Sequence, residues 1–309
     1  MGENSFEQQS YRNHELDYQE YANSDGGQKH VIKELFDVGT LYAWRHDRMR
    51  ATISPLLKNY PGSQWVTVGD GIGSDAHFLQ KAGANAVATD IADTVLKKAH
   101  EAGFIKDFRK ENAEALSFRD SQFDFVLCKE AYHHFPRPMV ALYEMIRVSR
   151  NGVVLIEPDD KAVVDGFRAL SLLQLPINLL LNFFKRKPAS RFRYYFDNYE
   201  DVGNYAYSIS EREMEKVALG LNLEMIAFKG INDYYITSDE GAIKDGNAGK
   251  LKKIKARIRN NDILCALGLI HYKILVAILF KIKPSDEGVR DLRDNGFKVM
   301  LLSRNPFIQ

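Results

Sequence analysis

The stretch that decides the fold reads Trp65-Val-Thr-Val-Gly-Asp-Gly-Ile-Gly-Ser-Asp75. Its first four residues are mostly apolar and predict a short buried strand, and residues 76–82 have the apolar spacing of a helix. Three glycines, Gly69, Gly71 and Gly73, lie between them. Glycines permit a tight turn and let a ligand approach backbone N–H groups at the start of a helix. Open α/β sheets bind nucleotides at such strand–turn–helix junctions, although a plain tight turn would use the same glycines.

Three further apolar runs follow, and helix-length segments separate them. These runs are residues 86–90, 123–128 and 151–157. Strands that alternate with helices predict an α/β protein with a parallel, doubly wound sheet. The first run ends in Asp90, 17 positions after Gly73, where a carboxylate can accept hydrogen bonds from both hydroxyls of a ribose. Residues 223–228 and 297–302 are predicted to be the last two strands.

The order of these motifs resembles that of the class I S-adenosylmethionine-dependent methyltransferases, in particular the type 11-like domain of small-molecule methyltransferases. The resemblance covers roughly residues 60–160. It implies a mostly parallel seven-stranded sheet with an antiparallel last strand, and S-adenosyl-L-methionine as the cofactor. The cofactor-binding residues that it implies are Gly69, Asp70, Gly71, Gly73, Asp90, Ile91, Asn112, Ala113, Glu114, Lys129 and Glu130.

Three positions depart from the pattern of that family. Thr67 stands two residues before the first glycine, where the family usually has an acid that helps to orient the methionine amine, so another group must do this here. Asp70 lies inside the loop, where a small residue is more common. Asn112 replaces a common aspartate, but its amide oxygen can still accept a hydrogen bond from the adenine amino group.

Two other functions remain open at this point. A dinucleotide-binding dehydrogenase requires Gly-x-Gly-x-x-Gly, but Ser74 occupies the position of the last glycine. A non-catalytic nucleotide-sensing or binding module would keep the cofactor site without the chemistry. Transfer of an isotope-labelled methyl group to an acceptor in cell extract would distinguish an enzyme from such a module.

A pair of histidines provides candidates for catalysis. Methyl transfer from a sulfonium is an in-line displacement that depends mainly on holding the acceptor close and aligned. A hydroxyl acceptor must also lose a proton to a base. His133 and His134 follow Cys128, at the end of a strand, by five and six residues, and histidine has a pKa near neutrality. One of them is predicted to be the general base, although both could simply pack or start a helix.

The predicted acceptor is a small molecule with a hydroxyl group: a sugar, a glycan intermediate or a lipid-linked compound. A cluster of acids, Glu157, Asp159 and Asp160, could hold a divalent cation that binds a substrate diol. Acids are more commonly found at the N-terminus of a helix, where the dipole favours them. We therefore predict no metal.

The chain divides into three predicted segments. Residues 1–60 would be an N-terminal arm and a helical cap, and the polar first thirty or so could order over a ligand. Residues 61–160 would be the Rossmann-like core that binds the cofactor. Residues 161–309 would be a helical lid together with the last two strands of the same sheet.

Two strongly apolar segments, residues 170–184 and 263–280, are predicted to be helices of that lid. Lys273 makes it improbable that the second spans a bilayer. The two either pack together or lie on a membrane surface, and in both cases they are predicted to wall the acceptor pocket. In the second case the basic residues 250–259 would meet anionic headgroups.

Composition sets the remaining limits. The 309 residues contain 42 Lys+Arg and 41 Asp+Glu, so charge gives no reason to expect nucleic acid as a partner, and we predict none. Cys128 and Cys265 are too few for a disulfide framework, and the N-terminus has no secretory signal. The predicted location is cytoplasmic, with membrane association as an open alternative. The sequence carries no signal of oligomeric state.

Overall fold

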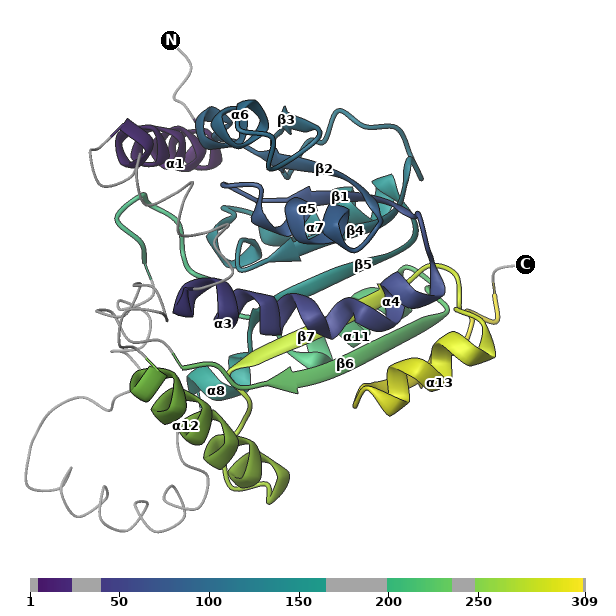
Figure 1. The fold of residues 1–309 in the computed structure, drawn as a ribbon. Coiled ribbons are helices and arrows are strands. Elements are labelled where there is room, and N and C mark those ends of the chain that lie inside the picture. The colour runs from purple at the N-terminus through teal and green to yellow at the C-terminus, as the bar shows by residue number, and fades with distance from the viewer. Residues whose placement is uncertain (1–4, 24–39, 165–198, 235–247, 308–309) are drawn as a thin grey trace, which may run out of the picture.

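The computed structural model describes residues 5–23, 40–164, 199–234 and 248–307. Among these residues the strands are β1 Gln64–Val68, β2 Asn85–Asp90, β3 Phe108–Lys110, β4 Phe123–Lys129, β5 Ser149–Pro158, β6 Met225–Ile231, β7 Ile274–Phe280 and β8 Lys298–Leu301. They form one sheet of eight strands in the order β3-β2-β1-β4-β5-β7-β6-β8 (Figure 1). Strands β1 to β5 are parallel to one another, whereas β7 is antiparallel to both β5 and β6. The predicted α/β fold class is confirmed.

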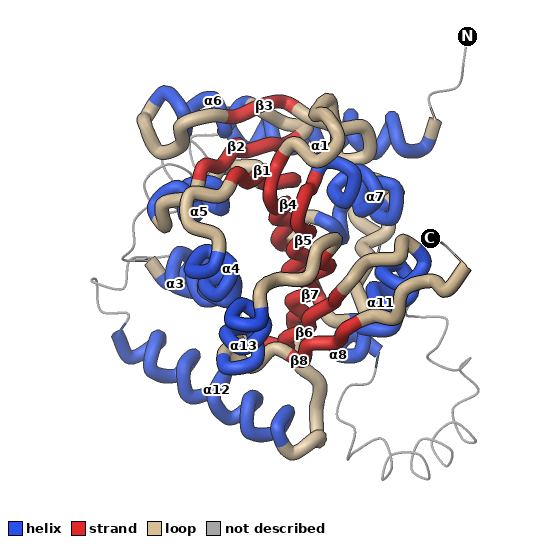
Figure 2. The backbone as a smooth tube through the Cα atoms, turned by 90° about the vertical axis from the view of Figure 1, so that its right-hand side faces the viewer, coloured by secondary structure: helices blue, strands red, loops and turns tan. Residues whose placement is uncertain are grey.

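Helices cover both faces of this sheet (Figure 2). The described helices are α1 Phe6–Asn23, α3 Leu41–Arg50, η1 Ala51–Ile53, α4 Ser54–Asn59, α5 Ser74–Lys81, α6 Thr94–Glu101, η2 Tyr132–His134, α7 Pro138–Val148, α8 Asp160–Val164, α11 Glu211–Gly220, α12 Ala248–Ala266 and α13 Asp286–Asp294. One apolar core lies under α3 to α6 and α13, and a second lies under α7 and α11. The sheet is thus buried on both sides, as continuous apolar strands require.

Local sequence explains several helix starts. Ser210 begins α11, because its Oγ accepts a hydrogen bond from the backbone N–H of Glu213 at 3.2 Å. Pro138 lies in the first turn of α7 and Pro55 in that of α4, where a missing N–H costs nothing.

The prediction of a helix over residues 263–280 was wrong. The first few of these residues end α12, and Ile274–Phe280 forms β7, which is completely buried between β5 and β6. A continuous apolar run is typical both of a buried helix and of a strand covered on two faces. Because these residues are inside the sheet, the predicted acceptor-pocket wall at residues 274–280 is also wrong. Residues 170–184 lie outside the described residues.

Strand β8 changes the expected strand count from seven to eight. It pairs antiparallel with β6, with Met225 opposite Leu301, so both predicted strands, residues 223–228 and 297–302, are present. The strand beside β5 is β7, and β8 lies at the edge of the sheet, next to β6.

The start of the chain is also more ordered than the polar composition suggested, because residues 6–23 form α1. No helix among the described residues is long and apolar enough to cross a membrane. The division of the chain into three segments stays a prediction.

Candidate active site

A pocket of about 380 Å³ opens at the carboxyl ends of β1, β2 and β4. This is the edge of an α/β sheet at which ligands usually bind. The predicted site residues that line it are Gly69, Asp90, Ile91, Ala113, Glu130 and His134. The other predicted residues do not line this pocket: Asp70, Gly71, Gly73, Asn112, Glu114, Lys129 and His133. Several of those brace the loops around it.

Asp70 holds the glycine loop in place. Its carboxylate is buried and accepts hydrogen bonds from the backbone N–H groups of Asp75 at 3.2 Å and Ala76 at 2.9 Å, at the start of α5. The hydroxyl of Thr67 donates to the same carboxylate at 2.9 Å. Burial, and next the charge of Asp75, raise the pKa of Asp70. Contact between Asp70 and the cofactor stays a prediction.

Gly69 and Gly71 are needed for different reasons. Gly69 has φ +73°, and a Cβ there would collide with the side chain of Ala131 and lie 3.3 Å from the ring of Phe135. A Cβ on Gly71 would lie 2.7 Å from Cε1 of Tyr18. The glycine at position 71 therefore makes room for a tyrosine of α1, a neighbour that the sequence did not suggest.

Asp90 ends β2 at the pocket wall. Its Oδ1 accepts a hydrogen bond from the backbone N–H of Ala92 at 2.9 Å. Burial raises its pKa to about 6. Hydrogen bonds from ribose hydroxyls would stabilise the charged form of this buried carboxylate. The position of Asp90 therefore suits the predicted ribose contact.

The segment expected to border the adenine is braced by its own side chains. The amide oxygen of Asn112 accepts the backbone N–H of Glu114 at 2.8 Å. The carboxylate of Glu114 accepts the backbone N–H of Arg137 at 2.8 Å and its Nε at 2.6 Å. Of these, Ala113 alone reaches the pocket wall. A contact from Asn112 to the adenine stays a prediction.

The histidine pair is held by two carboxylates. Glu157 is 0% exposed at the end of β5 and accepts hydrogen bonds from the backbone N–H groups of Ala131 and Tyr132, both at 2.9 Å, and from Nδ1 of His133 at 2.6 Å. Burial opposes protonation of His133, but the charge and hydrogen bond of Glu157 outweigh it and raise the pKa of His133. Glu157 is therefore fully engaged as an acceptor for this loop.

His134 lines the pocket itself. Its Nδ1 lies 2.8 Å from Oε2 of Glu200, and its ring centroid lies 3.9 Å from that of His133. Glu200 also lines the pocket. A carboxylate can only accept a hydrogen bond, so Nδ1 of His134 donates to Glu200, and in the neutral ring Nε2 keeps its lone pair.

Lys129 and Glu130 belong to a charged cluster under α3. The Lys129 ammonium donates to Nδ1 of His46 at 2.9 Å and lies 3.4 Å from the Glu130 carboxylate and 3.7 Å from that of Asp75. Arg50 donates to Asp75 at 2.6 Å. Burial, and next the Lys129 charge, hold the pKa of His46 well below its usual value. These ion pairs fasten α3 to the glycine loop.

Further residues line the pocket that were not predicted as site residues, among them Tyr11, His14, Tyr18, Glu111 and Glu200. Three of these come from α1, and their spacing of three and four residues is the signal that could have placed them on one helical face. Glu111 precedes the adenine-bordering segment, and its carboxylate accepts the backbone N–H of Ser117 at 2.9 Å. No sequence signal identifies Glu200.

Comparison with known proteins agrees with this geometry. Residues 66–156 match the family model described as a methyltransferase domain. This segment runs from β1 to β5 and contains the glycine loop, Asp90 and the histidine pair. Residues 66–156 are therefore a class I S-adenosylmethionine-dependent methyltransferase domain, and the resemblance seen in the motifs is confirmed.

Curated relatives are similar to about a third of the chain. The chain is 35% identical over 103 residues to a 2-methyl-6-phytyl-1,4-hydroquinone methyltransferase of Synechocystis sp., covering 32% of each chain. It is 36% identical over 98 residues to a ubiquinone biosynthesis O-methyltransferase of Methylococcus capsulatus, covering 29% of this chain and 40% of that one. An uncharacterized protein of Mycobacterium tuberculosis is 29% identical over 119 residues, 36% of this chain and 43% of its own. The chain thus spans less than half the length of these relatives. A crystal structure of an S-adenosylmethionine-dependent methyltransferase of Thermotoga maritima, titled a possible histamine N-methyltransferase, covers 88% of this chain and 100% of its own, with 16% identity and a TM-score of 0.49.

The raised pKa of Asp90 predicts a pH-dependent affinity for the cofactor. Above pH about 6 the carboxylate is charged and can accept ribose hydroxyls, whereas below it the free protein holds a protonated acid that accepts less well. S-adenosylhomocysteine affinity should therefore fall as the pH drops from 7 to 5, by at most about tenfold per unit for one proton. Calorimetric titrations across this range measure it.

The matched control is Asp90→Asn, because His14 and His134 are further ionisable side chains that line the pocket. The variant should bind more weakly at pH 7, and its affinity should depend less on pH than that of the wild type. Equal pH dependence in both proteins would show that Asp90 does not contact the ligand.

Proposed function

We propose that the chain as a whole is an S-adenosylmethionine-dependent methyltransferase. The observation that carries this proposal is the pocket at the carboxyl ends of β1, β2 and β4, where Gly69, Asp90 and Ala113 of the methyltransferase domain meet. Incubation with S-adenosylmethionine carrying a labelled methyl group, with cell extract as the source of acceptor, tests it. Transfer of label supports an enzyme, and binding without transfer from any extract supports the non-catalytic alternative.

The proposed acceptor is a hydroxyl group on a small lipid-linked molecule, with a sugar or glycan intermediate as the alternative. Two of the relatives are named as enzymes of hydroquinone and ubiquinone methylation. Those names support an acceptor of this size and chemistry. Extraction of the labelled product into organic solvent or into water separates the two acceptor classes.

The proposed general base is one of the histidine pair, and His134 is the better placed because it lines the pocket. Glu200 would hold its Nδ1 proton, so that Nε2 faces the acceptor as the basic nitrogen. His133, fixed by the buried Glu157, is the alternative base. The donor methyl is already activated, so the remaining task of the protein is alignment.

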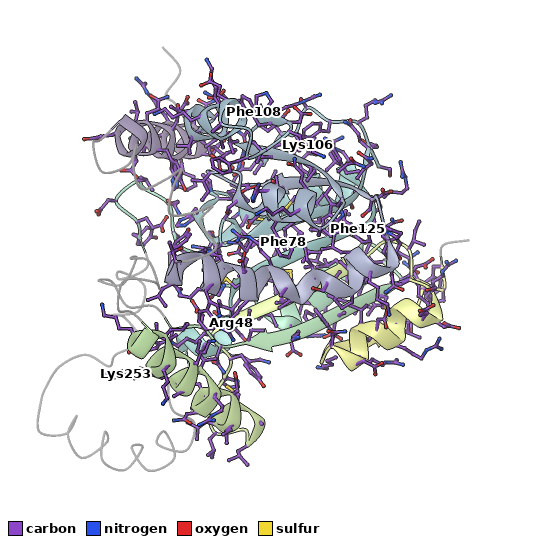
Figure 3. All side chains as sticks on the ribbon, viewed as in Figure 1. Arg48, Phe78, Lys106, Phe108, Phe125 and Lys253 are labelled. Carbon is purple, nitrogen blue, oxygen red and sulfur yellow. The ribbon has the colours of Figure 1, made fainter. Side chains whose placement is uncertain are left out.

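Peripheral contact with an anionic membrane is a further part of this proposal, and α12 supports it. Its cations Lys252, Lys253 and Arg259 are exposed, and Lys253 lies on the outer side of the helix (Figure 3). Its inner side packs Ile254 and Ile258 against α3. Ile263 and Leu267, at and just past its end, are 52% and 66% exposed. A basic helix with an apolar end is typical of a surface that meets lipid headgroups.

We expect the protein to sediment with vesicles that contain anionic lipid at low salt. The triple variant Lys252→Gln, Lys253→Gln, Arg259→Gln should bind more weakly by about 1 kcal/mol per residue, since each basic side chain contributes on this order near such a surface. A control with Lys97, Lys98 and Lys106 changed to Gln should bind normally. Absence of sedimentation, or equal loss in both variants, would contradict membrane contact by α12.

A further inference from the structure

Helix α1 forms one wall of the pocket. It contributes Tyr11, His14, Asp17 and Tyr18 to the lining. Tyr11, His14 and Tyr18 are three and four residues apart, so they lie on one face of the helix. Figure 1 shows α1 beside α6, next to the strands that carry the glycine loop and Asp90. The match to the methyltransferase family model begins only at residue 66, so the family pattern does not assign a role to α1.

Tyr11 carries an unused polar group into this wall. The side chain is 8% exposed, and its hydroxyl has no hydrogen-bond partner at bonding geometry among the described residues. Burial raises the pKa of Tyr11, and the nearby Glu114 carboxylate raises it further by its charge and by hydrogen bonding. The group therefore stays a neutral hydroxyl that can donate. Buried hydroxyls without a partner are uncommon in folded proteins and call for an explanation. The nearby Ala113 and Asp90 mark the adenosine end of the pocket.

Tyr18 is placed at the other end of the same face. Its ring lies so close to the glycine loop that a Cβ on Gly71 would be 2.7 Å from Cε1 and 2.8 Å from the hydroxyl oxygen. The absence of a side chain at position 71 is therefore matched to this tyrosine. Two helical turns separate Tyr11 from Tyr18, so α1 runs along the pocket from the adenosine end to the glycine loop.

Polar contacts fasten α1 to three separate segments. Glu7 forms an ion pair with Arg137 at 3.1 Å, and Glu15 forms one with Lys110. Asn13 donates to the carbonyl of Val202 at 3.1 Å, and His14 lies 3.1 Å from the side-chain oxygen of Asn204. These contacts hold the helix in register over the pocket. They are polar and partly buried, and no residue of α1 belongs to the two apolar cores that cover the sheet.

We propose that α1 is part of the cofactor site. Tyr11 supplies a hydroxyl to the adenosine moiety, and the ring of Tyr18 covers the glycine loop, so that bound cofactor and α1 stabilise each other. This inference rests on the proposed function, since it takes the pocket to be the S-adenosylmethionine site. It adds two specific binding residues and makes closure of α1 part of cofactor binding.

Calorimetric titration of the full chain with S-adenosylhomocysteine tests the role of Tyr11. Tyr11→Phe removes only the hydroxyl and should weaken affinity roughly 2–10-fold, the usual range for one neutral hydrogen bond. Tyr18→Ala should also weaken it. The control is Tyr143→Phe, an exposed tyrosine of α7, which should bind like the wild type. Thermal unfolding of each variant checks that the fold is intact.

Hydrogen exchange gives a second measurement that does not depend on any variant. Backbone amides of residues 6–23 should exchange more slowly when S-adenosylhomocysteine is bound, because the ligand holds α1 closed. Wild-type affinity in both tyrosine variants, with unchanged exchange in α1, would overturn this inference and leave the proposed function intact. A wild-type chain that binds no S-adenosylhomocysteine would overturn both.

Discussion

His134→Ala is expected to lower methyl-transfer turnover by about 10²–10⁴-fold, the usual contribution of a general base. The reason is its position: it lines the pocket, and Glu200 holds its Nδ1 at 2.8 Å. Affinity for S-adenosylhomocysteine should change little, because the base acts on the acceptor. Initial rates of label transfer and calorimetric titration measure the two quantities separately.

His133→Ala and His100→Ala serve as comparisons for this result. His100 is exposed on α6, and its replacement should not change turnover. His133 is anchored by the buried Glu157, so its loss should loosen the loop but leave a base in place. A larger loss in His133→Ala than in His134→Ala would assign the base to His133. Normal turnover in both would mean that proximity alone suffices.

Gly69→Ala is expected to have the largest effect on the fold of the site. A side chain at this position would adopt an unfavourable φ of +73° and would collide with Ala131. The left-handed conformation costs about 1–2 kcal/mol, and overpacking adds about 1–3 kcal/mol. The variant should lose about 2–5 kcal/mol of unfolding free energy and should no longer bind cofactor, because the turn lines the pocket. Urea unfolding and S-adenosylhomocysteine titration measure these losses.

Gly83→Ala is the matched control for that experiment. Gly83 has φ +88°, but a Cβ there would meet nothing within 4 Å. Gly83→Ala should therefore lower the unfolding free energy only by the cost of the left-handed backbone conformation, about 1–2 kcal/mol. It should leave cofactor binding unchanged. Equal losses in the two variants would show that the contact between Gly69 and Ala131 is unimportant.

The sequence predicted those elements whose pattern lies within a few neighbouring residues. The apolar runs at β1, β2, β4 and β5 were predicted because each is bounded by turn residues or acids. The glycine loop and Asp90 were placed at the pocket because the ends of neighbouring parallel strands necessarily meet at one edge of the sheet.

The strand β7 could not be assigned from its own residues. Every residue of Ile274–Phe280 is apolar, so the run has no polar–apolar periodicity that would distinguish a helix from a strand. Its place between β5 and β6 depends on pairing with residues far away in the sequence. The short edge strand β3 was missed because three residues carry too little pattern.

The sequence also did not predict which way the polar side chains near the pocket point. Asp70 and Asn112 were predicted to face the cofactor, but both have acceptor oxygens engaged by backbone N–H groups of their own loops. Short polar side chains commonly bond to nearby backbone, and sequence alone does not distinguish this from ligand binding. The polar helix α1 was missed for a related reason, since three aromatic residues on one face gave only a weak amphipathic pattern.

The most direct test of the account is calorimetric titration of the wild type and of Asp90→Ala with S-adenosylhomocysteine at neutral pH. The account predicts binding at one site in the wild type, because the pocket carries the glycine loop and Asp90 of a methyltransferase domain. It predicts affinity weaker by about 1.5–3 kcal/mol in the variant, since hydrogen bonds to a charged acceptor are lost. No binding by folded wild-type protein, or equal affinity in the variant, would contradict it.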